Sequence, residues 1–208
     1  MRKILLTLAL VFASAASYAQ TEWYVQANLS LNKYTYDTYE YTYEGIYEDI
    51  DVESSRMPGY EALVGFFKPM GSDMFLWGMN LGVANRGGKY ADVKESRFMA
   101  EFSPFDFNSR IQIGSSPIAV NPHVGLNFTF DIFGNYKVQN GGKEYEYDVF
   151  DDFDDANRFD VGLNYGVRVW FVGKTFFDFT VKQGFIKPWD YEIEGKSNRI
   201  CLGVGYSF

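Results

Sequence analysis

The strongest constraint on the fold of this chain is a strict alternation of apolar and polar side chains over long segments. In residues 120–132, bulky apolar side chains fall on one face, and Asn, His, Gly, Thr and Asp fall on the other. A run of this length with a period of two predicts a β-strand, because helical apolar positions recur every three or four residues. The same alternation returns in residues 23–32, 159–171 and 200–208. The chain is therefore expected to be all-β.

Four further segments alternate more weakly, at residues 60–68, 75–84, 97–113 and 176–186. Together the segments predict eight strands, and single-chain bacterial outer-membrane barrels have even strand numbers. No segment after residue 20 has an uninterrupted apolar run long enough for a membrane-spanning helix. We therefore expect an eight-stranded antiparallel up-and-down transmembrane β-barrel.

The composition of the two faces distinguishes a membrane barrel from a soluble one. A soluble barrel keeps its bulky apolar face inside and turns a charged face to water. Here the polar face consists of Gly, Asn, Ser, Thr and isolated charges, which is too small and too weakly charged for a solvated exterior. Small polar residues fit the narrow interior of a barrel of this size, so the bulky face is predicted to contact lipid.

The connections between strands indicate the same topology. Tight turns are expected at 69–73, 114–117 and 172–174, and longer loops at 37–55, 85–95, 134–157 and 187–197. Short turns on one side and long exterior loops on the other are typical of outer-membrane barrels. Pro104 and Pro122 each predict a bulge or a missing ladder bond, because proline has no backbone N–H. After Pro104 the apolar positions shift by one residue, which predicts a bulge at 103–105.

The N-terminus has the pattern of an export signal. Arg2 and Lys3 precede a short apolar stretch, and Ser17-Tyr18-Ala19 forms a cleavage pattern of small residues. The alternative is a membrane anchor, but the apolar stretch is too short to span a bilayer. The sequence therefore predicts a signal peptide at 1–19, a barrel domain at 20–208 and a location in the outer membrane of a Gram-negative bacterium. The net charge of -8 disfavours a nucleic-acid partner.

Three segments carry a resemblance to a known family. They are Ser103-Pro104-Phe105-Asp106-Phe107, Asn121-Pro122-His123-Val124-Gly125-Leu126 and the C-terminal Leu202-Gly203-Val204-Gly205-Tyr206-Ser207-Phe208. With the export signal and the alternating strands, they resemble the small outer-membrane β-barrel proteins of the Bacteroidota, the PorT-like barrels. The resemblance covers essentially the whole mature chain. It implies recognition of Phe208 by the barrel-assembly machinery, and a component of a secretion apparatus is one function that it implies.

The predicted inward face carries a mixed set of ionisable side chains: Glu101, His123, Asp131, Asp160, Arg168, Asp178 and Lys182. In a narrow barrel these charges are expected to pair and plug the interior, because an unpaired buried charge is costly. An ion-conducting pathway is the alternative. His123, the only histidine, is predicted to be a hydrogen-bonded interior residue near the periplasmic end, and a catalytic base is the alternative.

The predicted loop at residues 37–55 contains seven acidic and no basic residues, together with Tyr39, Tyr41, Tyr43 and Tyr47. Tyrosine offers a large contact area with few rotatable bonds, so these side chains are predicted to bind a protein or surface-glycan partner. Cation binding is the alternative there and at the acidic residues of 148–155, but the spacing does not match a calcium loop. No metal site or cofactor is expected, and Cys201, the only cysteine, cannot form an internal disulfide.

Together these features predict a non-enzymatic barrel, surrounded by outer-membrane lipid, that anchors or contacts partners through acidic, tyrosine-rich loops. An envelope-lipid-modifying barrel enzyme is the alternative from a different class. It would require a Ser, Asp or Glu within hydrogen-bond reach of His123 in an accessible cleft.

Overall fold

The computed structural model describes residues 21–36, 39–43, 46–50, 54–90, 92–153, 156–171, 174–188 and 195–208; the predicted signal peptide lies outside them. Eight long strands form the wall of a barrel: β1 (Glu22–Tyr36), β5 (Met57–Pro69), β6 (Phe75–Tyr90), β7 (Val93–Ser109), β9 (Ala119–Asn140), β11 (Phe159–Phe171), β12 (Thr175–Gly184) and β13 (Gly195–Ser207). The shorter strands are β2 (Tyr39–Tyr43), β3 (Ile46–Ile50), β4 (Ser54–Ser55), β8 (Ile111–Gln112) and β10 (Lys143–Asp148).

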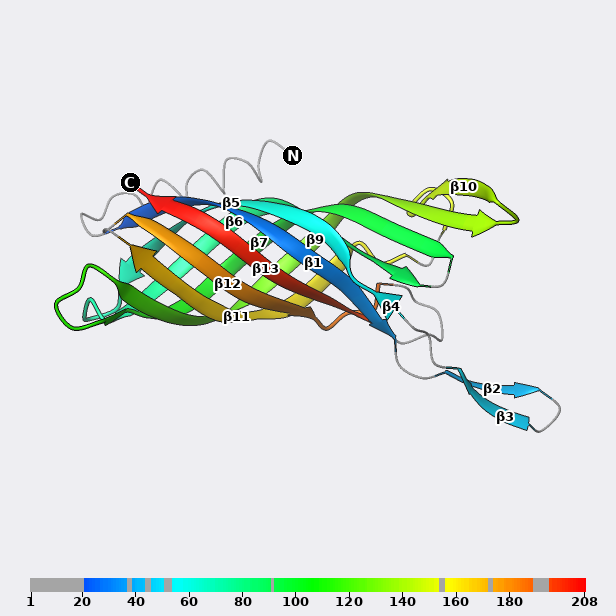
Figure 1. The fold of residues 1–208 in the computed structure, drawn as a ribbon, viewed down its shortest axis with the longest axis horizontal. Helices are drawn as coiled ribbons and strands as arrows, with labels where there is room; N and C mark the ends of the chain where they lie inside the picture. The colour runs from blue at the N-terminus through cyan, green and yellow to red at the C-terminus, as the bar shows by residue number, and fades with distance from the viewer. Residues whose placement is uncertain are drawn as a thin grey trace.

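The two ends of the barrel differ. Figure 1 shows the C-terminus at one end, together with the short connections, and β10 and the β2–β3 hairpin at the other. We call these the turn end and the loop end. By the rule that outer-membrane barrels have short periplasmic turns and longer exterior loops, the loop end is expected to face the cell exterior.

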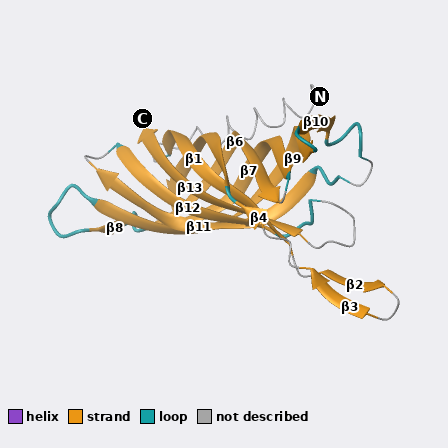
Figure 2. Ribbon diagram, turned by 45° about the vertical axis from the view of Figure 1, so that its right-hand side comes forward, coloured by secondary structure: helices purple, strands orange, loops and turns teal. Residues whose placement is uncertain are grey.

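The first and last strands close the barrel. β1 pairs antiparallel with β13, with Tyr24 opposite Ser207, and the Phe208 N–H donates to the Trp23 carbonyl oxygen at 2.9 Å. From β1 the ring continues through β5, β6, β7, β9, β11 and β12 to β13. Within the described residues each barrel strand therefore has two neighbours (Figure 2), and the predicted eight-stranded antiparallel barrel is confirmed. Closure removes the edges whose backbone groups would be unsatisfied in hydrocarbon.

The alternating pattern places apolar side chains outside and polar side chains inside, as predicted. On the outer wall Leu29 and Leu202 are 75% and 62% exposed, whereas Asn28 and Asn127 are buried in the interior. The apolar outer wall suits lipid, and the polar inner face suits a narrow interior filled by side chains. The part of the chain that the structure describes contains no helix long and apolar enough to cross a membrane.

The strand limits agree best with the sequence pattern near the turn end. β11 spans the predicted residues 159–171. The loop predicted at 85–95 is wrong, because β6 and β7 continue through it until Tyr90 pairs with Val93. Much of the loop predicted at 134–157 is also strand, since β9 runs to Asn140 and pairs with β10. Backbone ladders can continue beyond the lipid, where contact with lipid no longer enforces apolar alternation.

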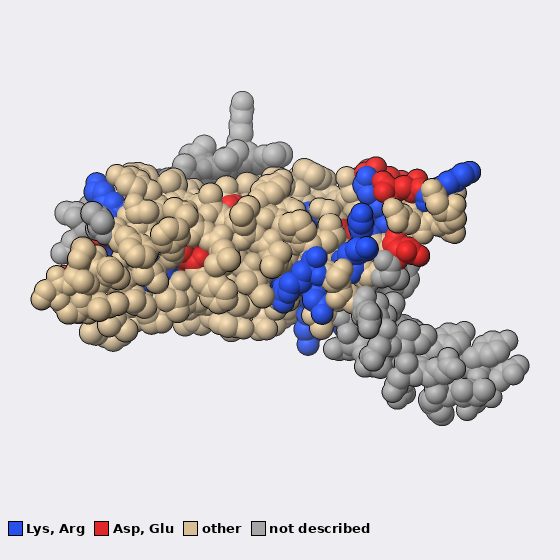
Figure 3. Space-filling view, in the orientation of Figure 1, with Lys and Arg blue, Asp and Glu red and all other residues tan. Residues whose placement is uncertain are grey.

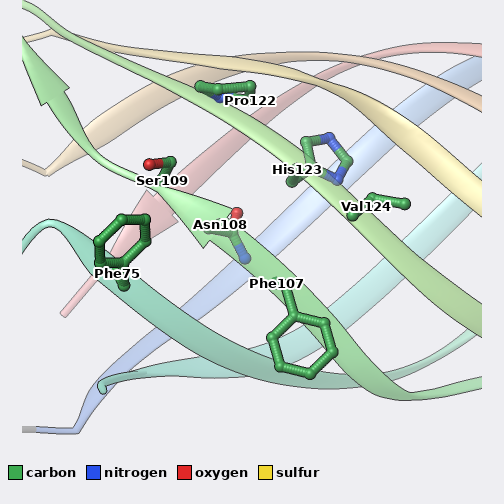
Figure 4. Close-up of a pocket in the computed structure, with 7 residues that line it drawn as sticks. All are labelled: Phe75, Phe107, Asn108, Ser109, Pro122, His123 and Val124. Atoms are coloured by element: carbon green, nitrogen blue, oxygen red, sulfur yellow. The ribbon is translucent and has the colours of Figure 1, made fainter. Parts of the chain in front are cut away.

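Both prolines interrupt the ladder between β7 and β9, as predicted. The register shifts between Phe102 and Phe105, around Pro104. Opposite Pro122 the ladder is missing, because it stops at the Asn108–His123 pair and resumes only where β8 pairs with β9. A groove of about 440 Å³ lies on the outer wall at this break (Figure 4). It is lined by Phe75, Phe107, Asn108, Ser109, Pro122, His123 and Val124.

Buried hydrophobic side chains fill the turn end of the interior. They are Tyr24, Phe67, Leu76, Ala119, Trp170 and Phe176, and we call them the aromatic plug. The rings of Tyr24 and Phe67 stack with centroids 4.5 Å apart, and those of Trp170 and Phe176 are 4.7 Å apart. Glycine provides the necessary space, because a Cβ atom at Gly65 or Gly205 would collide with the Tyr24 or Phe176 ring. The plug closes this end of the barrel.

Candidate functional site in the barrel interior and at the loop end

Ionisable side chains fill the interior between the aromatic plug and the loop end in three layers. The inner layer, next to the plug, contains Asp106, His123, Arg168 and Asp178. The middle layer contains Glu61, Glu101, Lys182 and Arg199. The outer layer contains Arg86, Glu95, Arg97, Asp131 and Asp160. All of these side chains are buried and sit at inward positions of the barrel strands.

The middle layer is a closed set of ion pairs. Lys182 Nζ lies 2.7 Å from Glu61 Oε2, and Arg199 Nη1 lies 3.0 Å from the same oxygen. Glu101 forms ion pairs with both cations as well. Each charged group therefore has two partners of opposite sign, and the charges of the layer balance. The layer spans the interior, because the strands that carry Glu101 and Arg199 lie on opposite sides of the ring.

In the inner layer, two carboxylates share two basic partners. The ring atoms Nδ1 and Nε2 of His123 each lie 3.3 Å from a carboxylate oxygen, of Asp106 and Asp178 respectively. Arg168 pairs with the same two carboxylates at 2.9 and 3.1 Å. Both ring nitrogens of His123 are therefore engaged in contacts that hold the interior together.

In the outer layer, Arg86 on β6 and Arg97 on β7 join residues from two other strands, β9 and β11. Arg86 pairs with Asp131 at 2.7 Å and with Asp160 at 2.8 Å. Arg97 pairs with Asp131 at 3.1 Å and with Glu95. The Arg97 guanidinium also donates to the carbonyl oxygens of Asn157 and Pro188, at 2.7 and 3.0 Å. This layer thereby ties connecting segments at the loop end to the barrel wall.

The packed layers leave little free space. A void between the middle and outer layers has a volume of about 10 Å³, which is room for about one water molecule. Arg86, Asp160, Lys182 and Arg199 are among the side chains around it. In the part of the chain that the structure describes, side chains and ion pairs occupy the positions that a water-filled channel would need.

The structure places all seven ionisable residues singled out from the sequence inside the barrel: Glu101, His123, Asp131, Asp160, Arg168, Asp178 and Lys182. Sequence reasoning missed six further members of the layers: Glu61, Arg86, Glu95, Arg97, Asp106 and Arg199. Arg97 and Arg199 could have been found from the parity of their strands, because Arg97 lies four residues before Glu101 and Arg199 lies two residues before the inward Cys201. Arg86 and Glu95 could not, because they fall in the segment predicted to be a loop.

His123 has some of the contacts of a catalytic histidine, but its imidazole is not accessible to a substrate. Asp106 lies at Nδ1, and the Thr180 hydroxyl lies 3.2 Å from Nε2. The Thr180 hydroxyl, however, donates to Asp178 at 2.6 Å. The imidazole is also 0% exposed, so His123 borders the groove of Figure 4 through its backbone. A general base must be able to reach a substrate, and the buried imidazole of His123 has no such access.

At the loop end, β9 and β10 form a hairpin beyond the barrel wall. Tyr145 and Tyr147 of β10 are exposed, and Lys137 pairs with Glu144 and Glu146 at 3.2 and 3.1 Å. Hydrogen bonds to Glu146 and Glu144, together with their charges, raise the pKa of Lys137. The side chains of Tyr39, Tyr41, Tyr43 and Tyr47 lie outside the described residues, although the backbones of β2 and β3 pair with each other.

Acidic side chains at the end of this hairpin accept hydrogen bonds from the backbone of the turn that follows it. Asp148 Oδ1 accepts the backbone N–H groups of Phe150 and Asp151, at 2.8 and 3.1 Å. Asp152 Oδ2 accepts the Asp148 N–H at 2.7 Å. Asp154 and Asp155 lie outside the described residues. Among the residues that are described, no group of three or more His, Cys, Asp or Glu side chains is arranged to hold a metal ion.

Comparison with protein families gives the same architecture. A family model described as an outer membrane protein beta-barrel domain matches residues 4–208. Among solved structures, the chain is similar to Neisserial surface protein A, with 13% identity, a TM-score of 0.48, and coverage of 89% of this chain and 97% of that one. It is also similar to OprG from Pseudomonas aeruginosa, with 9% identity, a TM-score of 0.46, and coverage of 91% and 96%. No curated protein matches the sequence.

Proposed function

Since the chain belongs to the outer membrane β-barrel family, we propose that it is a non-enzymatic, non-conducting anchor that contacts partners through its loop end. The observation that carries the proposal is the filled interior. The aromatic plug blocks the turn end, and the middle layer spans the barrel with balanced ion pairs. A filled interior leaves no path for a solute and no cleft for a substrate around His123. The outer surface and the loop end remain as the parts that can act.

The loop end has the composition of a contact surface. Exposed Tyr145 and Tyr147 on the β9–β10 hairpin add to the tyrosines of the acidic segment 37–55. Tyrosine supplies large, rigid contact area with one polar group, which favours binding to a protein or a glycan. The resemblance to PorT-like barrels supports a second hypothesis for the function, that the chain is itself a component of a secretion apparatus.

A pull-down from intact outer membranes tests the proposal. Deletion of residues 39–53 should remove the partner that the wild type retains, and membrane insertion should persist because this segment lies outside the ladder of barrel strands. The double variant Tyr145→Ser/Tyr147→Ser tests the hairpin in the same way. His123→Gln is the matched interior control and should retain the partner. Loss of the partner in His123→Gln, with retention in both loop variants, would contradict the proposal and favour the enzyme hypothesis.

A further inference from the structure

Accessible basic side chains mark the loop end of five neighbouring barrel strands. They are Lys196 on β13, Lys33 on β1, Arg56 before β5, Lys89 on β6 and Lys94 on β7, and we call them the basic row. Each of the four lysines is next to a buried inward residue in its strand, so each points away from the interior. Figure 3 shows lysine and arginine gathered between the largely uncharged wall and the loop end.

Cross-strand pairing and hydrogen bonds connect the row. Lys33 pairs with Asn198 on β13, two residues from Lys196. The Arg56 guanidinium crosses β1, because it donates to the Leu31 carbonyl oxygen and to the Asn198 side-chain oxygen, each at 3.0 Å. On the other side of Arg56, Ser55 pairs with Lys89, and Lys89 pairs directly with Lys94. The five cations therefore form one continuous surface.

The pair Lys89–Lys94 places like charges directly opposite each other, an arrangement that destabilises a sheet when no anion is present. Lys137, which lies opposite Lys94 on β9, is neutralised by Glu144 and Glu146. Within the described residues, the five members of the basic row form no ion pair with an Asp or Glu of this chain. Among the residues that the structure describes, the row is therefore a cationic surface without a carboxylate partner.

The position of the row points to the source of a counterion. Exposed Leu31 lies two residues from Lys33 toward the turn end. On β7, Phe98 lies four residues from Lys94 in the same direction and stacks on exposed Phe133, with ring centroids 5.0 Å apart. The row thus lies where the apolar wall gives way to polar surface, which is the level of lipid headgroups in a membrane barrel. We propose that the basic row binds the phosphate groups of anionic lipids in the leaflet at the loop end, with Lys89 and Lys94 sharing one phosphate.

Lipid binding by the purified, detergent-solubilised full chain tests this proposal, for example by native mass spectrometry. The probes are phosphatidic acid and phosphatidylcholine with identical acyl chains, and the variant is Lys89→Gln/Lys94→Gln. A basic residue near an anionic lipid contributes about fivefold in affinity, so the double variant should bind phosphatidic acid about 25-fold more weakly. The control is Lys143→Gln/Lys174→Gln, which removes the same charge at exposed positions outside the row and should bind as the wild type does.

Several results would overturn the proposal. Equal affinity of the wild type for the two lipids would show that the phosphate is not recognised. Equal losses in the row variant and the control variant would show that only net charge matters. Inorganic phosphate that binds as tightly as phosphatidic acid would show that a free anion, rather than a lipid, is the ligand.

A second measurement uses the repulsion between the two lysines. In phosphatidylcholine bilayers, Lys89→Gln/Lys94→Gln should be more stable than the wild type toward denaturant, because the like-charge pair is removed. In bilayers that contain phosphatidic acid, the order should reverse, because the wild type gains a ligand. An unchanged order in the two bilayers would contradict the proposal. The proposal stands independently of the partner contacts proposed for the loops, because both measurements use only lipid and the purified chain.

Discussion

Glu101 on β7 forms an ion pair with Arg199 on β13, from the opposite side of the barrel. Glu101 also pairs with Lys182, and Arg199 also pairs with Glu61, the two other members of the middle layer. The contact therefore joins distant parts of the wall through the centre of the interior. Because both groups are buried, the pair can persist only while each charge keeps its partners.

The first prediction removes one charge from this layer. Glu101→Gln leaves Lys182 and Arg199 to share Glu61, and an uncompensated buried cation should lower the free energy of unfolding by about 3–5 kcal/mol. Denaturant titration of the protein folded in lipid vesicles measures the change. Glu144→Gln on the exposed hairpin is the matched control and should change the value by less than about 1 kcal/mol. Equal effects of the two substitutions would show that the middle layer does not stabilise the barrel.

The second prediction concerns the two faces of the wall. Leu126→Arg or Val167→Arg places a charge on the lipid side and should destabilise the barrel by about 2–4 kcal/mol near the membrane midplane. Asn127→Ala, on the interior side, should cost less. Gly166→Ala is not a suitable interior control, because its Cβ atom would collide with the Phe179 carbonyl oxygen and approach the His123 ring. In the same vesicle titration, a larger loss for Asn127→Ala than for the arginine variants would mean that the faces are inverted.

The third prediction separates the hairpin from the barrel. Gly141 and Gly142 have φ angles of 59° and 80°, which a turn of the favoured hairpin type requires at both central positions. Gly142→Val should therefore destabilise the hairpin by about 1–2 kcal/mol, since L side chains are strained in this region. Hydrogen exchange should accelerate at residues 143–148 and remain unchanged in β11. Faster exchange throughout the barrel would show that the hairpin and the wall unfold together.

Much of the barrel could be predicted because lipid on one side and a narrow interior on the other impose a period of two. This constraint acts most strongly in the middle of the wall, and β11 accordingly matches its predicted limits. It weakens at the loop end, where Arg86 and Glu95 belong to paired strands although their neighbours do not alternate in hydrophobicity. There the ladder is extended by cross-strand pairing, which a single sequence does not reveal.

The ionic layers were only partly predictable for the same reason. Glu101 and Lys182 could be placed inside from the parity of their strands, and the same parity in residues 60–68 would have placed their partner Glu61 inside as well. Asp106 became an inward residue through the bulge at Pro104, which shifts the register between Phe102 and Phe105. Continuing the alternation of inward and outward positions through the bulge would have identified Asp106 as an inward residue. Which charges meet across the interior depends on strand stagger, and the alternation pattern contains no information about stagger.

The most direct test of the account is the ionic conductance of the wild-type protein in a planar lipid bilayer. An open porin inserted under the same conditions provides the positive control. We expect insertion without stepwise conductance, because the aromatic plug and the middle layer fill the interior and the void between the middle and outer layers has room for about one water molecule. Stable conductance steps that scale with salt concentration would contradict the account and would identify the interior as an ion pathway.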